Sequence, residues 1–111
     1  MKAKIIYGRI GKSTLAKHFA MRHHNGTYTI LEAGEHENQF DQPGWESTII
    51  FNDIPAGFDF ESMFNLIDPD EDKQVIFCTL FPPESSGVSF GARFEFIDSE
   101  DINNWPRPSQ P

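Results

Sequence analysis

Apolar residues occur along this chain in short runs, separated by polar segments that contain glycine, proline or asparagine. Five runs are rich in β-branched and aromatic residues and are bounded by turn-forming residues, which is the pattern of buried or half-buried strands. The predicted strands are residues 2–7, 27–33, 47–52, 73–80 and 93–97.

Two segments have a helical period instead. Residues 12–24 place apolar side chains on one face and end at the turn Asn25-Gly26. Residues 59–68 begin with the capping residue Asp59 and end before Pro69. Their apolar residues recur at i, i+3, i+4 and i+7 and are expected to face the sheet near Ile50, Ile76 and Cys78: Phe60, Met63, Phe64 and Ile67.

The order of these elements predicts one α/β domain. Strands that are separated by helices, rather than by two-residue turns, favour a mostly parallel sheet covered by helices. We therefore expect a three-layer domain, with about five strands and helices on both faces, over residues 1–98. Residues 99–111 contain three prolines and are expected to form an irregular tail, in which Trp105 either anchors a partner or packs the tail back onto the domain.

Length and composition exclude several classes of protein. A chain of 111 residues is the size of one domain, and 38% hydrophobic residues with eleven Phe suffice for a core. No run resembles a membrane span or a secretory signal, so we expect a cytoplasmic protein without a membrane partner. The single cysteine, Cys78, lies in an apolar run and is interpreted as a buried core residue.

Charge is divided unevenly along the chain. Residues 1–31 carry a net charge of +6, residues 32–111 carry −14, and the total is −8. An acidic surface disfavours nucleic acid, because Lys and Arg contacts to phosphate supply most of that affinity. It suits a basic protein partner, so a protein partner is expected.

The strongest motif lies between the first strand and the first helix, where Gly11, Lys12, Ser13 and Thr14 follow Gly8. Backbone N–H groups at a helix N-terminus suit phosphate oxygens, and a lysine there reaches the terminal phosphates. The hydroxyl that follows is suited to magnesium, which gives Ser13 the role of a metal ligand.

On these residues the chain resembles P-loop NTPases, and more narrowly the superfamily 3 helicase or AAA-like ATPase domain of small viral and mobile-element replication proteins. The resemblance runs from Lys2 to Ile97 and implies ATP and magnesium as cofactors. It implies that Asp53, Thr79 and Arg93 are catalytic, that Gly8, Gly11, Lys12, Ser13 and Thr14 bind nucleotide, and that Asp53 joins Ser13 at the metal. The matching segments are IIYGRIGKSTLAKHFA, STIIFNDI, FDFESMFNLID, VIFCTLFPPE and GARFEFID.

Three of the family's motifs are altered. Taking Gly8 as the first glycine of GxxxxGK[ST] leaves the loop two residues short. Asn52 stands where the first Walker B carboxylate belongs, and Leu80 and Phe81 follow Thr79 where a polar sensor belongs. Each loss removes charge or positioning from phosphoryl transfer.

We therefore expect a reduced P-loop NTPase-like protein of viral or mobile-element type, with weak or lost ATP hydrolysis. The alternative is a small acidic inhibitor or adaptor that binds a host protein, of the anti-defence or anti-CRISPR type, on a P-loop-like scaffold. In either case a viral protein of this kind would act in the host cytoplasm.

Overall fold

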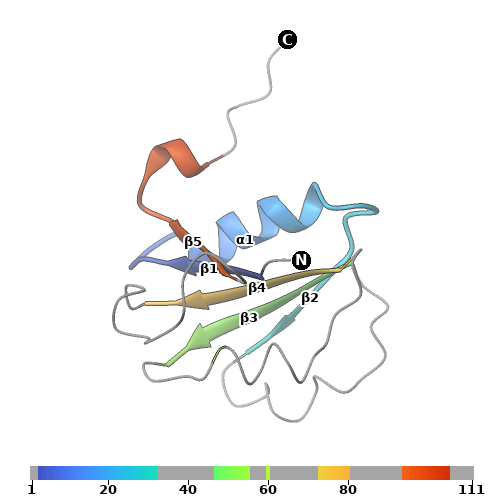
Figure 1. Cartoon of the computed structure of the whole chain (residues 1–111), viewed down its shortest axis with the longest axis horizontal. Helices are drawn as coiled ribbons and strands as arrows, with labels where there is room; N and C mark the ends of the chain where they lie inside the picture. Colours follow the sequence, from blue (N-terminus) through green and yellow to red (C-terminus); the bar gives the residue numbers. More distant parts are fainter. Residues whose placement is uncertain (1–2, 33–46, 56–59, 61–72, 81–93, 106–111) are drawn as a thin grey trace.

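The computed structural model describes residues 3–32, 47–55, 60, 73–80 and 94–105 (Figure 1). Within these ranges lie five strands, one α-helix of defined extent and a 3₁₀ helix. Their bounds are β1 Ala3–Tyr7, α1 Lys12–Met21, β2 Tyr28–Leu31, β3 Thr48–Ile54, β4 Gln74–Thr79, β5 Phe94–Asp98 and η2 Ile102–Asn104.

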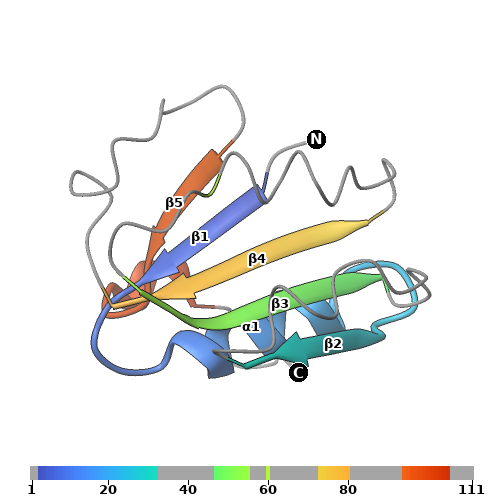
Figure 2. The same ribbon diagram turned by 90° about the horizontal axis from the view of Figure 1, so that it is seen from below.

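All five strands form a single parallel sheet in the order β2-β3-β4-β1-β5. Figure 2 shows their arrowheads directed to the same edge. Every predicted strand is confirmed to within two residues at each end, and the sheet is parallel throughout. β1 is an interior strand, paired with β4 on one side and β5 on the other.

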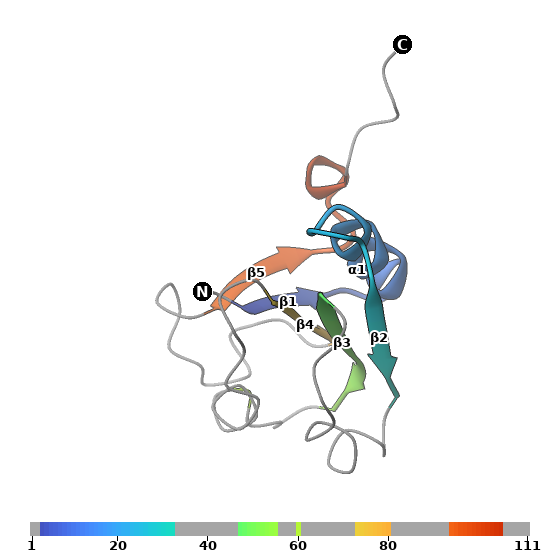
Figure 3. The ribbon, with the colours of Figure 1, turned by 90° about the vertical axis from the view of Figure 1, so that its right-hand side faces the viewer.

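Helix α1 covers one face of the sheet (Figure 3). It buries Leu15, Ala16 and Ala20 against side chains from the three central strands and β5. These are Ile6, Ile50, Ile76, Cys78 and Ile97. The predicted helix over residues 12–24 ends earlier, at Met21, because Arg22 N–H already bonds the carbonyls of Phe19 and Ala20 and His24 takes a left-handed backbone with φ of 46°.

Large aromatic side chains fill the opposite face. The Phe51 and Phe77 rings stack at 5.1 Å, and the Phe60 ring makes T-shaped contacts with Phe77 and Phe94. The expectation that Phe60 faces Ile50, Ile76 and Cys78 is wrong, since successive strand residues point to opposite faces and those three lie under α1. Of the predicted helix over residues 59–68 only Phe60 is described, and Met63, Phe64 and Ile67 lie outside the described residues.

The carboxyl ends of the parallel strands meet at one edge of the sheet, where ligands of open α/β sheets usually bind. The loop 8–11, the end of β3, the end of β4 and the segment 99–105 after β5 all start there. Among the described residues, no helix has the length and apolar character needed to cross a lipid bilayer.

Candidate functional site

The glycine loop between β1 and α1 is short and tightly curved. Gly8 has φ of 136° and Gly11, the residue before α1, has φ of 82°, both in the region that favours glycine. Gly11 accepts the first helical hydrogen bond, from Leu15 N–H at 2.9 Å, and no side chain of the described residues caps the helix N-terminus. The sequence predicts these first-turn amides, with the Lys12 ammonium and the Ser13 hydroxyl, as the groups that face a phosphate and its magnesium ion.

Lys12 folds back over the loop that precedes it. Its half-buried ammonium donates a hydrogen bond to the Gly8 carbonyl at 2.8 Å. Within the described part of the chain no carboxylate lies close enough to Lys12 to form an ion pair, so it is not bound to Asp53. Lys12 is the charged side chain of the first turn of α1, which contains no acidic residue.

Residues directly after β5 close over the other side of the loop. Ser99 N–H bonds the Tyr7 carbonyl at 2.8 Å, and the buried Ser99 hydroxyl donates to the Ile10 carbonyl at 2.7 Å. A Cβ on Gly8 would overlap that hydroxyl. The loop is thus fixed by the chain that follows β5 as well as by α1.

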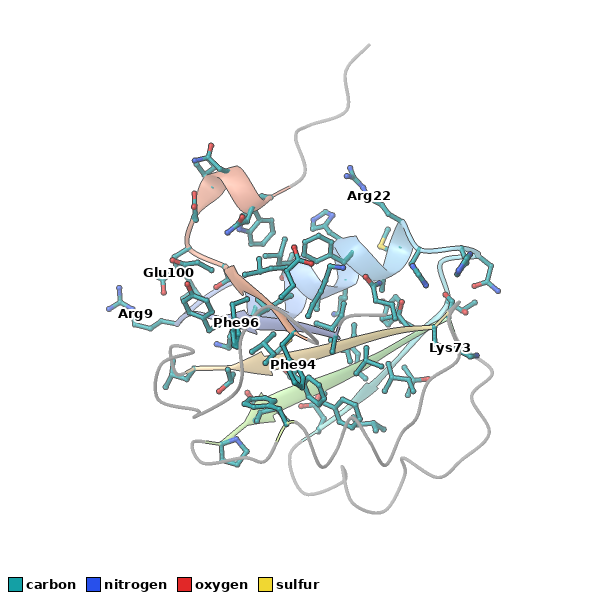
Figure 4. The ribbon with its side chains drawn as sticks, in the orientation of Figure 1. Arg9, Arg22, Lys73, Phe94, Phe96 and Glu100 are labelled. Atoms are coloured by element: carbon teal, nitrogen blue, oxygen red, sulfur yellow. The ribbon has the colours of Figure 1, made fainter. Side chains whose placement is uncertain are left out.

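Glu100 contacts the loop through an acidic side chain. Its Oε2 accepts the Arg9 backbone N–H at 2.7 Å, and its Oε1 lies 3.3 Å from the Arg9 guanidinium (Figure 4). The bond from the Arg9 amide, and next the bond from its side chain, lower the pKa of Glu100 below its ordinary value of 4.5. Glu100 is therefore ionised at neutral pH and bonded to a loop amide.

Trp105 completes this side of the site. Its indole N–H donates to the Ser99 carbonyl at 2.6 Å, its ring lies 2.9 Å from the position of a Cβ on Gly11, and it meets the His18 ring edge-on at 5.8 Å. Trp105 was expected either to anchor a partner or to pack on the domain, and in the structure it packs on the domain beside α1. An open pocket of about 430 Å³ lies here, lined by Ile10, Gly11, Ser99, Glu100, Ile102 and Trp105.

The end of β3 carries the two residues of the altered Walker B segment. The pairing with β4 shifts between Phe51 and Ile54, and Asp53 takes a left-handed backbone with φ of 56°. Such a bulge redirects side chains at the end of a strand. Asp53 is exposed, whereas the Asn52 amide donates to Glu32 Oε1 at 3.1 Å.

The side chains at the end of β4 form hydrogen bonds within the domain. The Thr79 hydroxyl is buried and donates to the Ile54 carbonyl at 3.0 Å, which bridges the bulge. The Cys78 thiol donates to the Lys12 carbonyl at 3.8 Å, and burial raises its pKa to about 12. This thiol is protonated at neutral pH, as expected for a core cysteine and unlike a nucleophile.

The structure therefore groups the predicted residues unevenly. The residues predicted to bind nucleotide lie together, in the loop before α1 and in its first turn: Gly8, Gly11, Lys12, Ser13 and Thr14. Asp53 and Thr79 lie at the same edge of the sheet, on β3 and at the end of β4. Arg93 lies outside the described residues.

Sequence reasoning missed Ser99 and Glu100. The sequence contains a local signal, the two aspartates Asp98 and Asp101, because aspartate favours turns closed by its own side chain. In the structure Asp98 Oδ1 accepts the Glu100 N–H and Asp101 Oδ1 accepts the Asn103 N–H. Such Asx turns mark a chain reversal directly after a strand. Once β5 is placed next to β1, that reversal can only lie beside the glycine loop.

No protein-family model matches the chain, and no curated protein or solved structure matches it significantly.

Proposed function

We propose that this chain is a reduced, three-layer P-loop NTPase-like domain of the viral or mobile-element replication type, with weak or lost ATP hydrolysis. The observation that supports it best is the turn at the carboxyl end of β1: an uncapped helix start, the Lys12 ammonium beside it and a glycine on each side of the loop. Such a turn offers N–H donors and one positive charge to an anion.

The contacts of two residues, Asn52 and Thr79, support weak hydrolysis. Asn52 is neutral and bonded to Glu32, and the Thr79 hydroxyl proton is used by Ile54. Neither side chain is therefore poised to hold magnesium or to orient an attacking water. Because phosphoryl transfer depends on positioning and charge stabilisation, the loss of these two contributions leaves binding largely without turnover.

Magnesium fits this chain only as a companion of the nucleotide. Among the described residues no cluster of three or more metal-ligating side chains occurs, and Ser13 and Asp53 are the ligands in question. Magnesium is commonly held by one or two protein oxygens together with phosphate oxygens and water. Ser13 and Asp53 would then complete the shell of a magnesium ion that arrives with ATP.

The first test is a titration of ATP, with and without magnesium, against wild type, Lys12→Ala and Lys17→Ala. Lys17 is the matched control, since it is half-buried on the same helix but one turn further on. Loss of the Lys12 ammonium should weaken binding about tenfold or more, the usual value of a hydrogen bond to a charged group. Equal affinity of wild type and Lys12→Ala would reject the site.

Turnover gives a second measure of the same proposal. Wild type should hydrolyse ATP more slowly than about 1 s⁻¹, the lower end for competent kinases. Asn52→Asp alone would set a carboxylate against Glu32, so the informative variant joins Asn52→Asp to Glu32→Gln, which keeps the pair. This double variant should turn over faster than wild type, and the single variant Glu32→Gln should not.

A second candidate function is an acidic inhibitor or adaptor that binds a basic protein on the same scaffold. The observation that favours it is the net charge of −8, with −14 carried by residues 32–111. The acidic run to neutralise is Asp70, Glu71 and Asp72, which lie outside the described residues. Binding of a lysine-rich peptide that falls with salt and with this triple neutralisation, but not in Lys12→Ala, would favour the adaptor over the NTPase-like domain.

A further inference from the structure

Glu100 places its carboxylate against the glycine loop that precedes α1. Its carboxylate accepts the Arg9 backbone N–H at 2.7 Å, a short bond for an amide donor. If Gly8 carried a Cβ, the same Oε2 would lie 3.3 Å from it. The carboxylate thus lies against the loop backbone itself, and not only against the Arg9 guanidinium.

The Glu100 main chain is fixed independently of its side-chain contacts. Ser99, next to it, bonds the loop through its amide and its hydroxyl, and the Ser99 carbonyl is held by Trp105. Glu100 N–H is held by Asp98 Oδ1 at 2.9 Å. The carboxylate is therefore presented to the loop by a chain that is already in place, at little entropic cost.

Nearby positive charges stabilise the ionised form of the Glu100 carboxylate. The Arg9 guanidinium is the nearest cation, and Lys12 contributes a weaker attraction that also favours the ionised form. Lys12 is also the cation that the proposed site offers to a phosphate at this loop. A carboxylate and a phosphate oxygen are equivalent acceptors for one N–H, and two anions in contact repel each other.

We propose that Glu100 makes an autoinhibitory contact with the loop: it is an internal anion that holds the Arg9 amide, so that a phosphate group binds only by displacing it. This inference rests on the proposed function, because it concerns the same loop. It predicts that the apparent affinity for a phosphate ligand is reduced by the fraction of molecules in which the carboxylate is bound.

The test compares the binding of pyrophosphate and of magnesium ATP to wild type, Glu100→Gln and Glu95→Gln by calorimetry. Glutamine keeps the shape of residue 100 and removes its charge. Glu95 is the matched control, because it is also an exposed glutamate but lies within β5, where it pairs with Lys4 at 3.9 Å, away from the loop. Glu100→Gln should bind both ligands about fivefold more tightly or better, as expected if the carboxylate holds the amide about four-fifths of the time. Glu95→Gln should not differ from wild type.

Adding Lys12→Ala to Glu100→Gln distinguishes this inference from the proposed function. If wild-type binding depends on Lys12 but Glu100→Gln binds no more tightly, the inference is wrong and the anion site stands. If neither wild type nor Glu100→Gln binds pyrophosphate, both are wrong. If Glu100→Gln gains affinity and Lys12→Ala removes the gain, both are supported.

An amide NMR spectrum checks the contact without a ligand. The Arg9 amide proton should resonate downfield in wild type and move upfield in Glu100→Gln, because a charged acceptor is replaced by a neutral one. The remaining amide resonances show whether the variant is folded. An Arg9 resonance that is unchanged in the folded variant would overturn the inference.

Discussion

Single residues of the glycine loop are constrained from two directions. Gly8 combines a backbone φ of 136° with a neighbour, the Ser99 hydroxyl, that leaves no room for a Cβ. Gly11 combines φ of 82° with the Trp105 ring. The loop is thus shaped for close approach of the chain that follows β5.

Gly8→Ala should therefore destabilise the fold by about 2–4 kcal/mol, because it adds backbone strain and a steric overlap. Urea unfolding followed by circular dichroism measures the loss. A second variant, Gly8→Ala with Ser99→Ala, relieves the overlap but not the strain. It should be more stable than the sum of the two single losses predicts, and strict additivity would show that residues 8 and 99 are not in contact.

At the scale of elements, β4 organises the core. Each of its six residues is buried, and it pairs with β1 on one side and β3 on the other. Its alternate side chains supply both cores, Ile76 and Cys78 under α1 and Val75 and Phe77 on the aromatic face. The strand therefore couples the two faces of the sheet.

Phe77→Ala should cost about 3–5 kcal/mol of unfolding free energy, because it leaves a cavity beneath the Phe51 and Phe60 rings. Leu80→Ala is the matched control, since Leu80 follows the same strand and is 50% exposed. Its stability should change by less than about 0.5 kcal/mol. Equal losses in the two variants would contradict the assignment of Phe77 to the core.

At the scale of the whole molecule, the domain extends beyond its last strand. Ser99 bonds two carbonyls of the first twelve residues through its N–H and hydroxyl, and Trp105 packs beside α1. A division of the chain after residue 98 would therefore separate the loop from the residues that hold it.

A chain that ends at Asp98 should be less stable than one that ends at Trp105 by about 2–4 kcal/mol. The loss combines the Ser99 hydrogen bonds with the apolar area covered by the indole ring. Thermal unfolding of the two chains measures it. Equal melting temperatures would place residues 99–105 outside the folding unit.

The sequence predicts the strands well because their signal is local. The runs KQVIFCTL (73–80) and STIIFN (47–52) are mostly apolar and rich in β-branched residues, and their bounds lie within two residues of those of β4 and β3. The start of α1 at Lys12 follows in the same way from the glycine before it. The end of α1 does not follow from the sequence, because residues 22–24 show no residue that stops a helix before Asn25-Gly26. In the structure the helix ends at Met21, and Gly26 N–H bonds the His23 carbonyl in the turn that follows.

Other features depend on contacts between distant segments. The sequence places Asp53 and Thr79 after strands, but only the paired sheet shows that Thr79 donates to Ile54 across a bulge. The predicted position of Phe60 on the sheet is also wrong. Periodicity shows which side of an element is apolar, but it does not show which face of the sheet that side packs against.

What the sequence by itself determined is the α/β class, the parallel strands and a loop whose glycines, lysine and hydroxyls suit an anion. Only the tertiary structure decided that β5 lies beside β1, and with it that Ser99, Glu100 and Trp105 reach the loop from about ninety residues away. The physical reason is that strand order is set by long-range pairing and burial of whole faces, whereas motifs and periods report only the nearest residues along the chain.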